Sequence, residues 1–197
     1  MARQYFNSTL ADSLIAASSV TPTTTPTSIF TPFNLGAQAF PVPVGQAAPF
    51  AGQVFRFACG GLITTPATGT LVITPYMGIG ASATSFTGAV ALGASAAQTV
   101  TASLASQPWR MEGELIFRTV SPVASSSTCW LCGNFSSQGT LATAGSGWNI
   151  QFGSTAAVTV DTTGTVAAGS GALNFVVTFS VSGATIITEY TSFQSLN

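Results

Sequence analysis

The residues in this chain that could perform chemistry are few, because it holds five carboxylates, three cysteines and no histidine. Histidine titrates near neutral pH and is the commonest metal ligand. Glu112 and Glu114 stand two residues apart, so on a strand they would share one face at about 7 Å, a spacing that a glycosidase could use. Arg110 and Arg118 would lie on that same face. A structural ladder of ion pairs is therefore favoured over a catalytic pair, and we expect the protein not to be an enzyme.

The three cysteines do not form a recognisable metal or redox site. Cys129 and Cys132 make a C-x-x-C motif, but on a strand positions i and i+3 face opposite sides. Redox and zinc sites need both sulfurs on one side, and Cys59 supplies only one further ligand. We expect all three to be buried as small apolar residues, with no metal or cofactor bound. Their odd number, without a disulfide framework, fits synthesis in a reducing cytoplasm.

Aromatic side chains offer a second kind of site. Tyr76, Trp130 and Trp148 could stack on sugar rings, as exposed aromatics of carbohydrate-binding sandwiches do. The alternative is that they belong to the core, as most aromatics must in a chain with 14 Phe. Gly60-Gly61 and residues 145–147 are interpreted as turns, because they lack the strand, loop and helix that a phosphate site needs.

Charged residues make up only 5% of the chain, against about 25% in an ordinary globular protein. Charge normally keeps monomers apart in solution, so this composition favours a protein that works in an assembly. The alternative is a secreted or thermally robust monomer with hydroxyl-rich faces. Four scattered arginines argue against nucleic-acid binding, and no apolar window of about 18 residues predicts a membrane span. Asp12 interrupts the apolar stretch that an export signal would need.

From about residue 38 the apolar pattern has the period of two that is typical of strands. Met111, Leu115 and Phe117 should point to the core, and Ser182-Gly183 should form a tight hairpin between the last two strands. Strands are predicted over 54–59, 71–74, 97–104, 111–120, 128–135, 148–152, 156–161, 173–181 and 185–193. Short strands with frequent turns indicate an all-β fold. We predict a jelly-roll-like antiparallel β-sandwich over residues 34–197.

Residues 1–33 are predicted to form an N-terminal arm. A short helix is expected over 5–18, followed by an extended strap over 19–33 that contains three prolines. The apolar stripe of that helix could pack on its own domain or on a neighbouring subunit, while the end of the strap should anchor to the sandwich. The predicted interface residues are Phe6, Leu10, Leu14, Ile15, Ile29, Phe30 and Phe33. Removing residues 1–30 is expected to abolish attachment and leave the sandwich folded.

Several stretches of the chain resemble small structural proteins of tailed bacteriophages. They are residues 92–100 (LGASAAQTV), 108–122 (PWRMEGELIFRTVSP), 158–165 (VTVDTTGT) and 173–190 (LNFVVTFSVSGATIITEY). In those proteins a Trp opens a strand that ends in Arg-Thr, and a T-V-D-T-T turn and a final hairpin follow. The matching residues are Trp109, Leu115 or Ile116, Arg118, Thr119 and residues 159–163. The likeness extends over most of residues 50–195.

The resemblance implies a jelly-roll protein on the virion surface, commonly trimeric, that decorates heads or forms tail and baseplate appendages. We therefore expect a trimeric capsid decoration or cement protein, made in the host cytoplasm. Its N-terminal arm would bind the major capsid protein or other virion proteins, and a self-contained sandwich with a reaching arm favours the head over the tail. The alternative is a tail or baseplate protein that binds a receptor or glycan. A glycan hydrolase would depend on Glu112 and Glu114.

Overall fold

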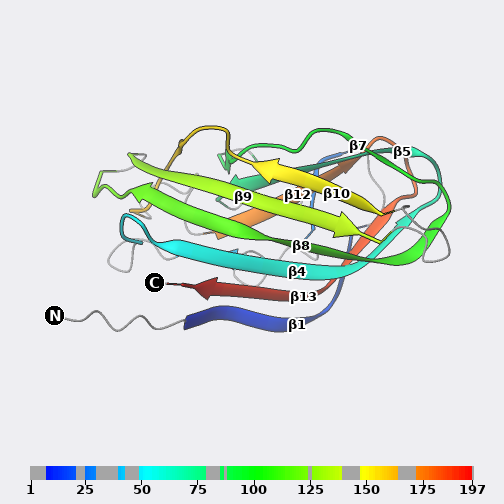
Figure 1. Ribbon diagram of the computed structural model, residues 1–197, viewed down its shortest axis with the longest axis horizontal. Coiled ribbons are helices and arrows are strands. Elements are labelled where there is room, and N and C mark those ends of the chain that lie inside the picture. Colours follow the sequence, from blue (N-terminus) through cyan, green and yellow to red (C-terminus); the bar gives the residue numbers. More distant parts are fainter. Residues whose placement is uncertain are drawn as a thin grey trace.

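The computed structural model describes residues 25–29, 42, 49–78, 85–86, 88–123, 126–138, 147–163 and 172–196, and the backbone of 8–20 and 40–41. In these ranges the regular structure is entirely β, with two antiparallel sheets in two layers (Figure 1). The predicted all-β antiparallel sandwich is thus confirmed at this level. None of the described elements is a helix long and apolar enough to cross a membrane.

The larger layer, sheet A, is built around long central strands. Its order is β1 (Ser8–Val20), β13 (Thr185–Ser195), β4 (Val54–Thr65), β8 (Leu104–Thr119), β9 (Ser127–Ser137) and β10 (Trp148–Gly153), and β11 (Val158–Val160) also pairs with β9. Figure 1 shows β1, β13, β4, β8 and β9 side by side in this order. Consecutive strands β8, β9 and β10 form a meander, whereas β13 lies beside β4 from the other end of the chain.

The smaller layer, sheet B, has the order β2 (Thr27–Ser28), β12 (Ala172–Phe179), β5 (Gly69–Met77) and β6 (Val90–Ala91). Two short strands complete it: β3 (Phe40–Pro41) pairs with β12, and β7 (Gln98–Val100) pairs with β5. The strand predicted over 97–104 is therefore divided, because Ser103 adopts a positive φ of 60° between β7 in one sheet and β8 in the other.

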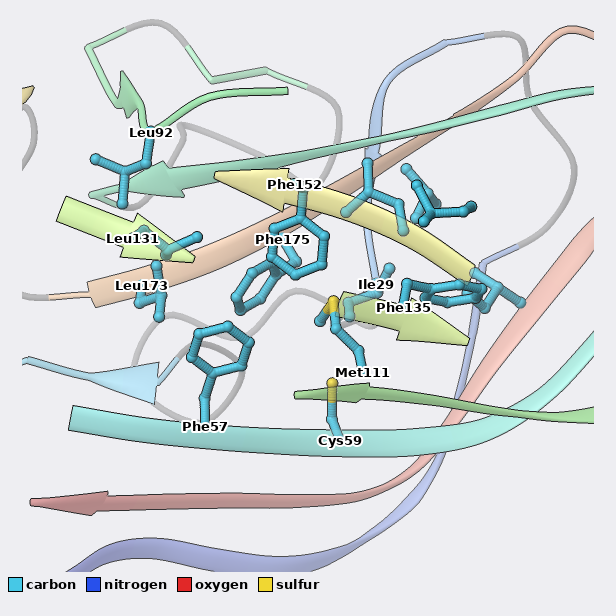
Figure 2. Packing of buried hydrophobic residues seen from close by; sticks show 14 of the residues in the cluster. Ile29, Phe57, Cys59, Leu92, Met111, Leu131, Phe135, Phe152, Leu173 and Phe175 are labelled. Atoms are coloured by element: carbon cyan, nitrogen blue, oxygen red, sulfur yellow. The ribbon is translucent and has the colours of Figure 1, made fainter. Parts of the chain in front are cut away.

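The core lies between the sheets and is dominated by aromatic rings. Phe57 of β4 and Phe175 of β12 meet with centroids 4.7 Å apart, and Phe152 of β10 packs on Phe175 at 5.7 Å (Figure 2). Gly113 makes room for this cluster, since a Cβ there would lie 2.5 Å from the Phe57 ring. Met111, Leu115 and Phe117 of β8 are each at most 1% exposed, which confirms the inward face predicted for this strand.

The helix predicted over 5–18 is wrong in the described part, because Ser8–Val20 form β1 along the edge of β13. The pairing places Leu14 opposite Tyr190, almost the whole chain away. A short helix with a narrow apolar stripe is marginal by itself, whereas the edge of β13 offers a row of backbone partners. The stabilisation that β1 obtains by pairing with the distant strand β13 is not visible in the local sequence pattern.

Two predicted strand ends are also wrong. Gly60 and Gly61 lie inside β4 and do not end it. These positions require glycine because β13 lies very close: a Cβ on Gly61 would lie 2.0 Å from the Ile187 carbonyl oxygen. Pro75 lies inside β5, paired with Phe175 on one side, and its carbonyl oxygen accepts a hydrogen bond from the Leu92 N–H on the other. Proline is tolerated inside a strand at a position where the sheet does not require its backbone N–H as a hydrogen-bond donor.

The turn at Ser182-Gly183 joins two sheets instead of closing a hairpin. β12 pairs with β5 in sheet B, and β13 pairs with β4 in sheet A. Gly183 has a φ of 90°, which allows the chain to reverse and cross between the layers. The prediction of a tight hairpin here is therefore wrong, although the turn itself is present.

The strap predicted over 19–33 is part of the sandwich where the structure describes it. Thr27 and Ser28 form β2 on β12, and Ile29 enters the core at 1% exposure (Figure 2). Its backbone N–H donates to the Phe175 carbonyl oxygen at 3.0 Å. Removing residues 1–30 would therefore take away part of the core, contrary to the expectation that the sandwich would remain intact.

Candidate functional site: the outer face of sheet A

Charge is distributed unevenly between the two sheets. None of the six strands described in sheet B contains a charged residue. The strands of sheet A contain Asp12, Arg56, Arg110, Glu112, Glu114, Arg118 and Glu189. Among the other charged residues, Asp161 follows β11 and Arg3 lies outside the described residues. Among the described strands, charged side chains are thus confined to sheet A.

Two ion pairs lie on the outer face of sheet A. Arg56 Nη2 and Glu114 Oε1 are 2.8 Å apart across β4 and β8, and Arg110 Nη2 and Glu112 Oε2 are 2.6 Å apart along β8. A ladder of ion pairs on this strand was predicted, but the partner of Glu114 is Arg56 and not Arg118. That partner could not be read from one strand, because it depends on the register of β4 against β8. Both pairs are solvent-exposed, so each adds at most about 1 kcal/mol to stability.

A shallow depression of about 550 Å³ lies between these pairs. Beside the four charged residues it is lined by Cys132 and Asn134 of β9 and by Gly113 and Gly133. Gly113 and Gly133 face each other across β8 and β9, so backbone forms the floor between the charged side chains. The Oδ1 atom of Asn134 is buried and has no hydrogen-bond partner. We name this depression and its lining residues the charged depression.

Two exposed aromatic side chains lie on the same outer face, near opposite ends of the charged depression. Tyr190 of β13 is 37% exposed and covers Gly60, where a Cβ would lie 2.5 Å from its ring. Burial raises the pKa of Tyr190, with a lowering contribution from Arg110 and a raising one from Glu112. Trp130 of β9 is 40% exposed, and its Nε1–H donates to the Ser154 carbonyl oxygen.

The cysteines divide between the two faces of sheet A. Cys59 and Cys129 are fully buried, whereas Cys132 is exposed and lines the charged depression. The prediction that all three are buried is thus wrong for Cys132, which faces away from Cys129 as the strand period requires. Burial raises the pKa of Cys129 to about 12 and raises that of Cys59 as well. Neither buried thiol is a nucleophile in the folded protein, because the thiolate is the reactive form.

The three predicted sugar-stacking residues are not brought together. Tyr76 is half-buried in β5 and stacks on Phe86 with centroids 5.1 Å apart. Trp148 is 7% exposed and lies over Phe135 with nearly parallel rings. Of the three, only Trp130 presents more than a third of its surface to solvent. Sequence reasoning missed Tyr190, whose position over Gly60 depends on a bulge between Thr188 and Tyr190.

The predicted interface residues of the arm fall in three groups. Ile29 is buried in the sandwich core, and its carbonyl oxygen accepts a hydrogen bond from Thr188 Oγ1 at 2.8 Å. The backbones of Leu10, Leu14 and Ile15 belong to β1. Phe6, Phe30 and Phe33 lie outside the described residues.

Two of the residues that carry the resemblance to phage proteins, Trp109 and Asp161, have structural roles here. Trp109 Nε1–H donates to the carbonyl oxygens of Leu62 at 3.2 Å and Ile187 at 3.0 Å, so one indole joins β4, β8 and β13. Asp161 Oδ1 accepts hydrogen bonds from the N–H and the Oγ1 hydroxyl of Thr163 and so forms a local turn. Neither residue is set up as a catalytic group.

Within the described residues, no group of three or more histidine, cysteine, aspartate or glutamate side chains could hold a metal ion. The arrangement on sheet A can form hydrogen bonds and stacking contacts with a bound molecule. Comparisons with protein families, with curated proteins and with solved structures found no match.

Proposed function

We propose that the protein is a non-enzymatic structural component of a bacteriophage virion, a jelly-roll-type sandwich that assembles as a homotrimer on the capsid surface. One observation supports it above the others: the strands of sheet B are free of charge, while the charged strands all belong to sheet A. Protein interfaces are depleted of charge at their centres, and charged side chains favour water. Sheet B is therefore the side that faces neighbouring copies, and sheet A faces solvent.

The outer face of sheet B has the chemistry that such packing needs. Asn174 and Val176 on this face of β12 are already buried within the chain, so its accessible part consists of half-buried residues such as Val72, Thr74 and Thr178. They offer methyl groups and hydroxyls, which can pack and hydrogen-bond across an interface without the desolvation cost of a charge. A single lysine in the middle of this face should accordingly be incompatible with assembly.

Attachment to the shell is assigned to the N-terminal segment. Among the described strands, β1 is the terminal strand of sheet A and pairs with β13. An edge strand can pair with a strand of another chain through its outer row of backbone groups. In this proposal the segment before β2 binds the major capsid protein or another virion protein, and the sandwich projects from the shell.

The assembly surface is tested by Val72→Lys, measured by sedimentation velocity against the unaltered protein. We expect the unaltered chain to sediment as an oligomer and Val72→Lys as a monomer with an unchanged circular dichroism spectrum. The matched control is Gln151→Lys, which places the same charge on the exposed face of β10 and should leave the oligomer intact. Equal sedimentation of all three proteins would exclude sheet B as the interface.

The location on the virion is tested by electron microscopy of particles labelled with an antibody against the sandwich. Regular label over the head supports a decoration protein. Label at the tail tip would favour the alternative of a receptor- or glycan-binding tail protein, for which Trp130 is the exposed aromatic. Unlabelled intact particles would refute the virion assignment.

A further inference from the structure

We propose that the charged depression on sheet A is a binding site for a neutral saccharide, with Trp130 and Tyr190 as stacking platforms at its two ends. This inference names a ligand class that the assembly proposal does not contain. It is also independent of that proposal, because a monomer could bind a saccharide through the same face.

The charge balance of the depression selects against simple ions. Its two arginines and two glutamates form two ion pairs, so the four side chains carry no net charge. Each guanidinium has five N–H donors and each carboxylate has two oxygens, so both pairs keep donors and acceptors for a ligand. A sugar hydroxyl donates one hydrogen bond and accepts others, and hydrogen bonds to ionised partners are the stronger ones.

Asn134 supplies a second, independent reason for a polar ligand. Asn134 is one of the lining residues, and its Oδ1 atom is buried without a hydrogen-bond partner. A buried acceptor without a donor destabilises the folded state, so a group that donates to it is favoured. A ligand hydroxyl in the depression could be that donor, which an ion-pair ladder alone would not provide.

The aromatic side chains give the site its extent and orientation. Tyr190 lies in the cross-strand row of Gly60 and Arg110, and Trp130 lies in the row of Ile116. Six residues of β8 separate these rows, which is about 20 Å at 3.4 Å per residue. That length accommodates an oligosaccharide whose C–H faces stack on the rings while its hydroxyls reach the charged groups between them. The indole of Trp130 is fixed by its hydrogen bond to Ser154 before any ligand arrives.

The test is binding of the full chain to neutral oligosaccharides of glucose, galactose, mannose and N-acetylglucosamine, followed by titration calorimetry of any that bind. Trp130→Ala and Glu112→Gln should each raise the dissociation constant about tenfold or more, equivalent to about 1.4 kcal/mol. Phe50→Ala is the matched control, since Phe50 is an aromatic residue of similar exposure, 42%, that precedes β4 and lies outside the cross-strand rows of Tyr190 and Trp130, and it should leave affinity unchanged.

Glu112→Gln keeps the size of the side chain on an exposed position, so it tests the site even if Trp130→Ala does not fold. Absence of binding to every neutral oligosaccharide would overturn the inference. Binding restricted to sialylated or sulfated oligosaccharides would overturn it too, because it would contradict the charge balance. Binding that survives both Trp130→Ala and Glu112→Gln would place the sugar elsewhere. None of these results depends on the oligomeric state.

Discussion

Replacing Ile29 tests whether the segment before the main sandwich belongs to the folding core. Its side chain is 1% exposed, its N–H is bonded to Phe175 and its carbonyl oxygen to Thr188. Ile29→Ala removes three buried carbons and leaves a cavity, and substitutions of this kind cost about 2–5 kcal/mol. We expect a loss of about 3 kcal/mol in the free energy of unfolding. For a chain of 197 residues this lowers the melting temperature by about 6–12 °C.

The assay is urea denaturation followed by tryptophan fluorescence, with thermal melting as a second measurement. Thr25→Ala is the control in the same segment, because Thr25 is exposed, and it should change stability by less than about 0.5 kcal/mol. An equally small effect of Ile29→Ala would refute the placement of Ile29 in the core. Deleting residues 1–30 should destabilise the protein at least as much as Ile29→Ala, whereas a deletion that ends at residue 20 keeps β2 and Ile29.

Other predictions concern a close strand contact and the thiols. Gly61→Ala should cost about 3 kcal/mol in urea denaturation, because its Cβ would meet the Ile187 carbonyl and push β4 from β13. In the folded protein Ellman's reagent should titrate Cys132 alone, and it should reach Cys59 and Cys129 only after unfolding. Since burial raises the pKa of both buried thiols, the unfolded chain loses their protons first as pH rises. The free energy of unfolding should therefore fall above about pH 9, by up to about 1.4 kcal/mol per pH unit for each thiol, and Cys129→Ala should reduce that slope.

The sequence predicted the strands in which large apolar residues recur at alternate positions and point into the core. β8 and β12 have such long apolar patterns that their existence and the inward face of β8 could be derived locally. Local pattern failed where a distant strand determines the conformation. The local sequence of β1 predicts a weak helix, because its pairing with β13 is not visible in that pattern. Gly60-Gly61 predict a turn by themselves, whereas in the structure β13 lies too close for a side chain at these positions.

The candidate site was predicted in part. Glu112, Glu114 and Arg110 could be grouped from one strand, because alternate positions share a face. Arg56, Asn134 and Tyr190 join them only through the registers of β4, β9 and β13, which a single sequence does not specify. Trp130 was identified as a candidate for sugar stacking, yet its exposure could not be separated from the burial of Trp148 by residue type alone.

The most direct test of the assembly account is the mass of the unaltered chain in solution, measured by light scattering on gel filtration over a range of concentrations. A single chain has a mass of 19.9 kDa, and the account predicts about three times that value. A mass that stays at 19.9 kDa at every concentration would contradict assembly through the charge-free strands of sheet B.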